Sequence, residues 1–372
     1  MNFDFSAEQI MVQDSVRSYL ADAWSMARLR RLIEDDGDGF DAALWDGLAA
    51  LGLPAILVPE ALGGLGLGFV DLALVLEECG RALVPGPLVE TMIATDAIVR
   101  FGTEAQRLAL LPGIAAGRLR VVPAIVESGD APLATPLAGG WSLSGHRMLV
   151  PWAAQADKLL VAVRFAADAA AGLVIVDPQQ AGVSLRAETL FDPTARAFDV
   201  SFDRVVFGAA EVLGGGPSAA AVERIGDAGA VAAAAQMCGI AARMLDLAVA
   251  YACQRVQFGR PIGAFQAIKH RCADMLVQLE SGRTAAYFAT WALASAAPEA
   301  VRAVSMAKAY CGDASRFICN ETIQIHGGVG FAWELDLHLY LRRAKTLEYS
   351  YGDATAHRER LLGAVLAGRE AA

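Results

Sequence analysis

The chain has 372 residues, of which 55% are hydrophobic and 19% are charged. This length suits about two or three domains with a large buried core, and the composition argues against a disordered chain. The net charge of −10 argues against a nucleic-acid-binding protein, which needs a basic surface for phosphates.

The first third of the sequence predicts helices. Residues 6–9 form a capping box, Ser-Ala-Glu-Gln, and apolar residues then recur at helical spacing. Further helical patterns cover about 42–50, 70–83 and 105–111, and a glycine-rich turn at 63–68 separates two of them. We therefore expect an N-terminal helical domain over residues 1–119.

The pattern changes near Arg120 to short alternating runs broken by Gly, Pro and Asp. Strands are predicted near 141–150, 158–164, 172–176 and 197–207. They indicate a middle β domain over residues 120–216 with antiparallel strands. Residues 214–218, Gly-Gly-Gly-Pro-Ser, are typical of a linker, and helical patterns then cover a third domain, residues 217–372. The predicted fold class is α+β, in the order helical, β, helical.

Neither the cysteines nor the apolar segments indicate a metal site, a disulfide framework or a membrane protein. No two of the six cysteines form a C-x-x-C pair, and all lie among apolar, helix-like residues. The N-terminus lacks the basic and apolar regions of a secretory signal, and the apolar stretch Ala228–Ala242 is short for a bilayer. We expect a buried core helix there and a cytoplasmic protein.

Four segments resemble the acyl-CoA dehydrogenase family, and they are spread from the first domain to the last. They are Val58–Leu67 with Glu77–Arg81, Phe202–Phe207 with Val212–Gly214, Arg255–Gln266 running on to Met275, and Gln324–Phe331. The resemblance implies that family's fold, with an N-terminal helical domain, a middle antiparallel β domain and a C-terminal four-helix bundle. It also implies flavin-dependent α,β-dehydrogenation of an acyl-CoA thioester, with electrons passed to an electron-transfer flavoprotein.

The family binds FAD between subunits, and its R-x-x-F-G and Q-x-x-G-G-x-G segments grip the ADP half of a flavin whose ring lies mainly in the neighbouring subunit. By resemblance, the residues that serve this ADP half are Arg255, Phe258, Gln266, Gln324, Gly327 and Gly328. A guanidinium suits a pyrophosphate, and glycine lets the backbone approach it. The alternative is that Arg255 caps a helix and the glycine pair is a plain helix end. His326, inside the motif, is interpreted as structural.

The catalytic base of the family is missing from both of its usual positions. Most members carry a glutamate in a Y-E-G-T segment near the C-terminus, and that position falls here on Tyr351. Others carry it on the helix before R-x-x-F-G, where this chain has Gly229. A phenol, with a pKa of about 10, is a poor replacement for a carboxylate, and glycine has no side chain.

The β domain also departs from the family pattern. The T-E-P-x-x-G-S-D segment, which lines the flavin ring and thioester, is poorly matched by Ala124–Pro132. The W-I-T segment normally places a tryptophan and a threonine against the flavin ring, and those positions are Leu149 and Pro151. The residues that serve a neighbour's flavin are therefore present, whereas those that would hold this chain's own flavin ring are degraded.

Three hypotheses follow from this resemblance. The first is the non-catalytic subunit of an α2β2 heterotetramer, active only with a related catalytic subunit, as in enzymes of bacterial lipid or steroid catabolism. The second is a self-sufficient homo-oligomer with a displaced base, for which Glu348, Asp353 and Asp227 are candidates. In their alternative roles Glu348 pairs with Arg342 or Lys345, Asp353 caps the next helix, and Asp227 is solvated. The third is an interaction protein that binds no flavin.

Overall fold

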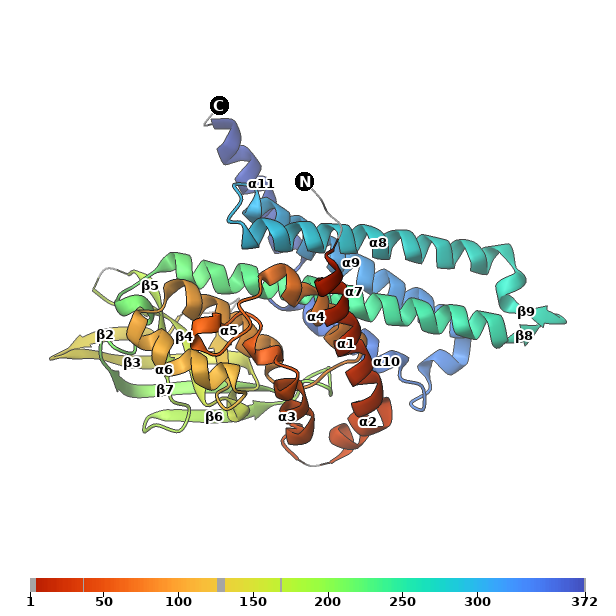
Figure 1. Cartoon of the computed structure of the whole chain (residues 1–372). Helices are drawn as coiled ribbons and strands as arrows, with labels where there is room; N and C mark the ends of the chain where they lie inside the picture. The colour runs from red at the N-terminus through yellow and green to blue at the C-terminus, as the bar shows by residue number, and fades with distance from the viewer. Residues whose placement is uncertain (1–4, 36, 126–130, 168, 371–372) are drawn as a thin grey trace.

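The computed structural model describes residues 5–35, 37–125, 131–167 and 169–370. Six helices come first, a twisted sheet follows, and long helices complete the chain (Figure 1). The N-terminal helices pack both on the sheet and on the C-terminal helices, and one continuous hydrophobic core joins the two helical domains. The predicted order of helical, β and helical segments is confirmed.

The N-terminal domain consists of short helices whose ends follow local sequence signals. They are α1 (Ala7–Ala23), α2 (Met26–Glu34), α3 (Ala42–Ala50), α4 (Phe69–Arg81), α5 (Leu88–Phe101) and α6 (Glu104–Ala115). The predicted capping box is present, because the Gln9 N–H donates to the Ser6 hydroxyl (3.2 Å) and the Ser6 N–H donates to the Gln9 side chain (3.0 Å). Sequence periodicity did not identify α2 and α5.

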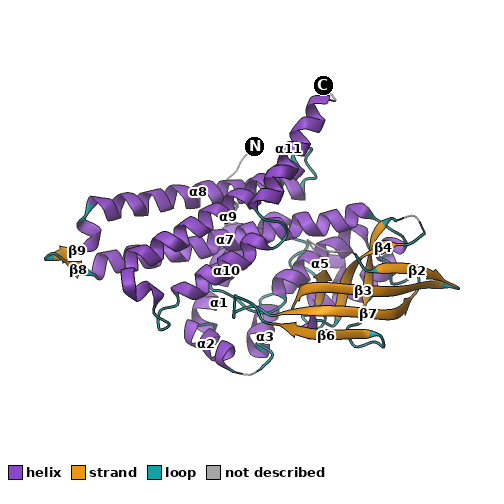
Figure 2. Cartoon of the chain, turned by 180° about the vertical axis from the view of Figure 1, so that it is seen from behind, coloured by secondary structure: helices purple, strands orange, loops and turns teal. Residues whose placement is uncertain are grey.

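The middle domain is a β domain, as predicted, but its sheet is mixed. Its strands are β1 (Val121–Ala124), β2 (Leu133–Leu137), β3 (Gly140–Pro151), β4 (Lys158–Phe165), β5 (Ala171–Val176), β6 (Val183–Glu188) and β7 (Ala197–Phe207). The order is β1-β4-β2-β3-β7-β6, with β5 on β4 (Figure 2). β4 pairs in parallel with both β1 and β2. The prediction missed these two short strands, since each contains a proline, which weakens a strand signal.

The C-terminal domain is a bundle of long helices. They are α7 (Ala219–Gln254), α8 (Gln266–Ala294), α9 (Ala300–His326), α10 (Leu337–Tyr349) and α11 (Ala354–Glu370), and a small hairpin of β8 (Val256–Gln257) and β9 (Arg260–Pro261) joins α7 to α8. Helix α7 is long and apolar enough to cross a membrane, yet 94% of its most apolar window is buried inside the protein. It is the core helix that the sequence predicted.

A buried arginine fixes the β domain against the helical bundle. Arg343 on α10 donates to the Asp192 carboxylate (2.6 Å) and to the Thr194 carbonyl (2.8 Å) in the segment between β6 and β7. Arg343 and both of its partners are buried. Because a buried charge is costly without partners, this contact holds the sheet in one position relative to α10.

Glycines allow α4 and α7 to cross at close range. An ideal Cβ at Gly239 on α7 would overlap the Glu77 carbonyl oxygen and lie 2.7 Å from the Arg81 nitrogen, both on α4. Gly80 on α4 makes the reciprocal approach to the α7 backbone. Backbone atoms leave no room for a methyl group here, so this crossing depends on glycine.

We predict that Gly239→Ala lowers the free energy of unfolding by about 3 kcal/mol, because the two helices must separate. Gly226→Ala on the same helix is the matched control, since nothing lies within 4 Å of its added methyl group. It should stabilise the protein by about 0.5 kcal/mol. Urea denaturation measures both, and equal midpoints for the two variants would contradict this account of the crossing.

Candidate functional site

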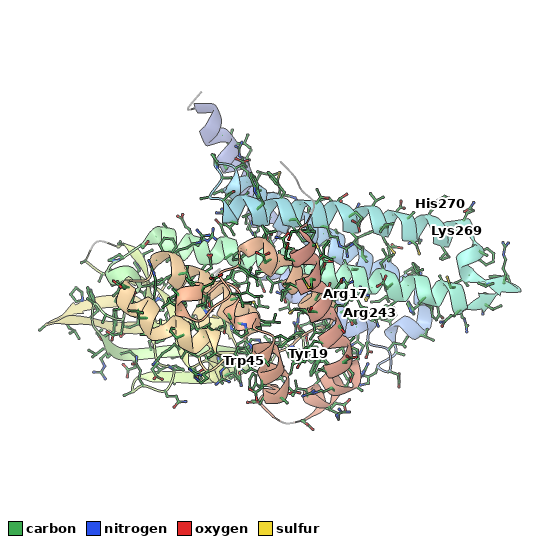
Figure 3. All side chains as sticks on the ribbon, viewed as in Figure 1. Arg17, Tyr19, Trp45, Arg243, Lys269 and His270 are labelled. Carbon is green, nitrogen blue, oxygen red and sulfur yellow. The ribbon has the colours of Figure 1, made fainter. Side chains whose placement is uncertain are left out.

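The residues that resemble the family's ADP-binding set lie at one end of the C-terminal bundle. Arg255 follows the end of α7, Phe258 is in the hairpin, Gln266 begins α8, and Gln324 and the glycine pair lie at the end of α9. Figure 3 marks this end by Lys269 and His270 on the first turn of α8. All six residues are exposed. We call these six residues the ADP clamp.

The hairpin of the ADP clamp presents an aromatic ring to solvent at a cost in backbone energy. Phe258 and Gly259 have φ angles of +53° and +77°, as a two-residue hairpin turn of the mirror-image type requires. The left-handed conformation costs a non-glycine residue roughly 1 kcal/mol. The Phe258 ring makes an edge-to-face contact with Phe265, with centroids 6.1 Å apart, yet its side chain is 92% exposed. A strained, exposed aromatic residue suits contact with a ligand or another chain.

Arg255 has a fixed backbone and an available guanidinium group. Its N–H donates to the Tyr251 carbonyl (2.8 Å), and its carbonyl accepts from the Ile262 N–H (2.8 Å). Within the described residues, neither a carboxylate nor any other acceptor pairs with the Arg255 side chain. The guanidinium can therefore bind a phosphate without first breaking an ion pair.

The glycine pair has open space beside it, although the Gly327 N–H caps α9 by donating to the carbonyls of Ile323 and Gln324. Gly327 has a φ of +65°, and an added Cβ at either Gly327 or Gly328 would meet nothing within 4 Å. The neighbouring His326 stacks on Tyr251 with ring centroids 4.2 Å apart, and its Nδ1–H donates to the Thr322 carbonyl (2.8 Å). His326 thus fixes the end of α9 against the end of α7. The exposed, unpaired arginine and the open glycine backbone fit the ADP half of FAD.

The two base positions of the family meet in this structure. An ideal Cβ at Gly229 would lie 2.5 Å from Cζ of Tyr351, and closer still to Cδ1 and Cε1. Tyr351 itself adopts a φ of +58° in the turn between α10 and α11. The ring therefore covers the bare backbone of α7 at Gly229. A side chain at position 229 and a tyrosine at 351 exclude each other.

The three carboxylates proposed as displaced bases are engaged elsewhere. Glu348 is buried and pairs with Arg316 and with Lys345 (2.9 Å). Asp353 accepts from the Ala356 N–H (2.8 Å) and caps α11, as the sequence predicted. Asp227 was predicted to be solvated, and that prediction was wrong, because it is buried and pairs with Arg360 of α11.

Two buried side chains that the sequence did not single out hold the turn that carries Tyr351. The Lys308 ammonium group donates to the carbonyls of Glu348 (2.8 Å) and Gly352 (2.7 Å). The His357 Nε2–H donates to the Tyr351 carbonyl (2.8 Å). Burial is the main cause that lowers the pKa of His357. Their only sequence signal is a lysine and a histidine at apolar helical positions, which periodicity alone cannot assign.

The two residues of the β domain that depart from the family's W-I-T pattern lie at the end of β3. Leu149 has a φ of +53° and an exposed side chain, and Pro151 closes the strand. Within the segment Ala124–Pro132, residues 126–130 lie outside the described residues. Between this domain and α10 the surface has an open hollow of about 390 Å³. It is lined by Phe191, Lys345, Thr346 and Tyr349.

Glu90 is a further carboxylate that the sequence analysis did not consider, and it is half-buried. It lies in the first turn of α5, and within the described residues its Oε2 atom is inaccessible and has no hydrogen-bond partner. Burial raises its pKa to about 7, and the charge of Arg343 opposes this shift. A carboxyl group that titrates near neutrality is suited to proton transfer, although a structural role also produces such shifts.

Comparison with known proteins identifies the relatives of this chain. The N-terminal domain model of acyl-CoA dehydrogenases matches residues 6–118, and the C-terminal domain model matches residues 220–366. Acyl-CoA dehydrogenase IpdE2 of Mycobacterium tuberculosis is 35% identical, over 91% of each chain. Acyl-CoA dehydrogenase FadE34 of the same organism is 36% identical over 91% of this chain, which spans about half (45%) of FadE34.

Solved structures of acyl-CoA dehydrogenases are also similar to this chain. The Tcur3481–Tcur3483 steroid ACAD contains a chain with a TM-score of 0.90 and 32% identity, covering 98% of this chain and 99% of its own length. The ChsE4–ChsE5 complex from M. tuberculosis contains one with a TM-score of 0.91 and 26% identity, covering 99% of each chain. Butyryl-CoA dehydrogenase from Megasphaera elsdenii has a TM-score of 0.90 at 25% identity, covering 98% of this chain and 100% of its own.

The contact between Gly229 and Tyr351 predicts strong coupling between the two positions. Gly229→Ala alone should lower the free energy of unfolding by about 2 kcal/mol, because the ring must leave its place. In a Tyr351→Ala background the same substitution should cost nothing. A double-mutant cycle from urea denaturation measures the coupling energy. Additive effects of the two substitutions would show that the ring does not rest on Gly229.

Glu90 predicts a specific pH dependence of stability. The pKa of Glu90 is raised from 4.5 in the unfolded chain to about 7 in the folded protein. Its protonation therefore stabilises the folded state fully below pH 4.5. This contribution is lost as the pH rises through 7. Wild-type protein should lose roughly 1–3 kcal/mol between pH 5 and pH 8, and Glu90→Gln should remove most of this loss. Parallel pH profiles of stability for the two proteins would refute the prediction.

Proposed function

The chain belongs to the acyl-CoA dehydrogenase family, and from that premise we propose that it is the non-catalytic subunit of a heteromeric acyl-CoA dehydrogenase. In this proposal it supplies the ADP-binding half of a FAD site, and a related catalytic subunit supplies the base, the pocket for the flavin ring and the acyl-CoA site. The observation that carries the proposal is the Tyr351 ring on Gly229, since these are the two usual positions from which family members present their base.

Proton abstraction next to a thioester needs a carboxylate aimed at the acidic carbon. In this chain Glu348, Asp353 and Asp227 are each held by an ion pair or a helix cap. Moving Glu348 or Asp227 to a substrate would break its ion pair, and moving Asp353 would remove the cap of α11. Without a base, the chain on its own cannot begin the reaction of the family.

The ADP clamp can still bind and orient a flavin for a neighbour. Bound FAD supplies the acceptor for the hydride that leaves the β-carbon of the substrate. The Arg255 guanidinium would hold the pyrophosphate, and the open backbone at Gly327 and Gly328 would let it approach closely. Gln266 and Gln324 would offer amide hydrogen bonds, and Phe258 would pack beside the nucleotide. All these groups face away from the chain, as a site shared with a second subunit requires.

The relatives support an assembly of two different chains. Two similar structures are of paired proteins, the Tcur3481–Tcur3483 steroid ACAD and the ChsE4–ChsE5 complex. We therefore propose an α2β2 heterotetramer that acts on a bulky acyl-CoA such as a steroid derivative. In this proposal it works in the cytoplasm with an electron-transfer flavoprotein as acceptor.

A self-sufficient dehydrogenase with a displaced base is the second candidate. Glu90 favours it, because a carboxyl group with a pKa of about 7 could act as a general base. Glu90 lies on α5 in the N-terminal domain, whereas the family's bases come from α7 and from the turn after α10. Turnover of an acyl-CoA by the purified chain alone, lost in Glu90→Gln, would establish this candidate.

The first test of the proposal is Arg255→Ala in the complex with a co-expressed catalytic subunit. Removing the guanidinium should weaken FAD binding at least about a hundredfold, because a charge-assisted bidentate contact is lost. The measurement is the visible flavin absorbance of the purified complex, followed by FAD titration of the apo-complex. Arg204→Ala, an exposed arginine of the β domain, is the control and should leave FAD binding unchanged.

The second arm of this test concerns Tyr351. Tyr351→Phe should leave kcat of the complex within about twofold, because this phenol takes no part in proton transfer. The proposal is wrong if the chain binds FAD and turns over acyl-CoA by itself, or if Arg255→Ala leaves FAD binding intact.

A further inference from the structure

The glycine pair of the ADP clamp belongs to a segment, residues 327–336, that links α9 to α10. Its first part is a 3₁₀ helix, Gly327–Phe331, and Asp336 precedes α10. Hydrogen bonds from the Ala332 N–H to the Val329 carbonyl (3.0 Å) and from the Leu335 N–H to the Ala332 carbonyl (3.1 Å) make the segment continuous. These bonds order the part of the segment that lies between the glycines and α10.

One end of this segment is anchored within the bundle. His326 immediately precedes Gly327, stacks on Tyr251 of α7 and donates to the Thr322 carbonyl. An added Cβ at either glycine would meet nothing within 4 Å, and Gly327 has a conformation open mainly to glycine. Glycine loses more conformational entropy on ordering than any other residue. The position of the pair therefore depends on what holds the two ends.

The other end is anchored by an arginine from the N-terminal domain. Arg30 on α2 donates to the Asp336 carboxylate (2.7 Å) and to the Trp333 carbonyl (2.5 Å). Its guanidinium also lies 5.5 Å from the centre of the Trp333 ring, which stacks on His338 at 4.6 Å. The Arg30 and Asp336 side chains are only 18% and 31% exposed, so this ion pair is less screened than a surface pair.

We propose that Arg30 is a positioning residue for the ADP clamp, acting through Trp333 and Asp336 to hold the glycine pair where a pyrophosphate can meet its backbone. The inference rests on the proposed function of the clamp. Three different kinds of contact from one side chain fix both the position and the rotation of the segment. Pre-ordering of this kind raises ligand affinity, because binding no longer has to order the segment.

Helix α2 also provides a matched control for Arg30. Arg28 makes the same kinds of contact, with the Asp41 carboxylate (2.6 Å), the Ala23 carbonyl (2.9 Å) and the Trp24 ring (5.6 Å). None of these partners lies in residues 327–336. Arg28→Ala and Arg30→Ala therefore remove similar interactions from the same helix, and only the second releases the segment.

The first measurement is amide hydrogen exchange of the full chain without ligand. Arg30→Ala should accelerate exchange in residues 327–336 about tenfold. Arg30→Lys, which keeps the charge but not the planar fork, should have a smaller effect. Arg28→Ala should leave this segment unchanged and accelerate exchange near residues 23–41. Equal exchange in 327–336 for Arg28→Ala and Arg30→Ala would overturn the inference.

The second measurement is the Kd for FAD of the complex with its catalytic subunit. Arg30→Ala should raise this Kd about tenfold, as loss of an outer support commonly does, while Arg28→Ala leaves it unchanged. The Arg255→Ala variant separates the inference about Arg30 from the proposed function of the ADP clamp. If Arg255→Ala weakens FAD binding but Arg30→Ala behaves like Arg28→Ala, the inference fails and the proposed function stands. If Arg255→Ala has no effect on FAD binding, the proposed function fails.

Discussion

The packing of the Tyr351 ring on the bare backbone of Gly229 is the constraint on which the rest of the structure depends. Lys308 and His357 fix the turn between α10 and α11 by donating hydrogen bonds to the carbonyls of Glu348, Tyr351 and Gly352. The position of this turn sets where α11 begins. With that volume filled by the Tyr351 ring, position 229 has no room for a side chain, and neither position 229 nor position 351 presents a carboxylate. The remaining acidic groups of this region serve as ion pairs and a cap.

The opposite end of the bundle, which carries the ADP clamp, is exposed rather than filled. There the chain keeps an exposed guanidinium, an exposed phenylalanine in the left-handed conformation, and a glycine pair with open space beside it. The contacts of His326 and Arg30 hold this end in order from two different domains. Filled base positions and an exposed ADP clamp within one chain are consistent with the proposed division of work between two kinds of subunit.

Sequence reasoning predicted the domain order, the core helix α7 and the capping of α11 by Asp353, because these follow from local periodicity and short-range hydrogen bonds. It identified Tyr351 and Gly229 separately but gave no sign that they touch, since the contact joins distant segments. The burial of Asp227 was mispredicted for the same reason. Arg30 and Asp336 are 306 residues apart, so no local pattern relates them. Prolines concealed the two strands that make the sheet mixed.

The most direct measurement of the central claim is the number of flavins in the purified assembly. If this chain contributes only an ADP clamp and its partner contributes the pocket for the ring, each pair of unlike chains holds one FAD. Quantitative absorbance of the denatured complex, divided by the protein content of each chain, gives this ratio. A ratio of two FAD per pair, or a flavin bound by this chain alone, would contradict the account.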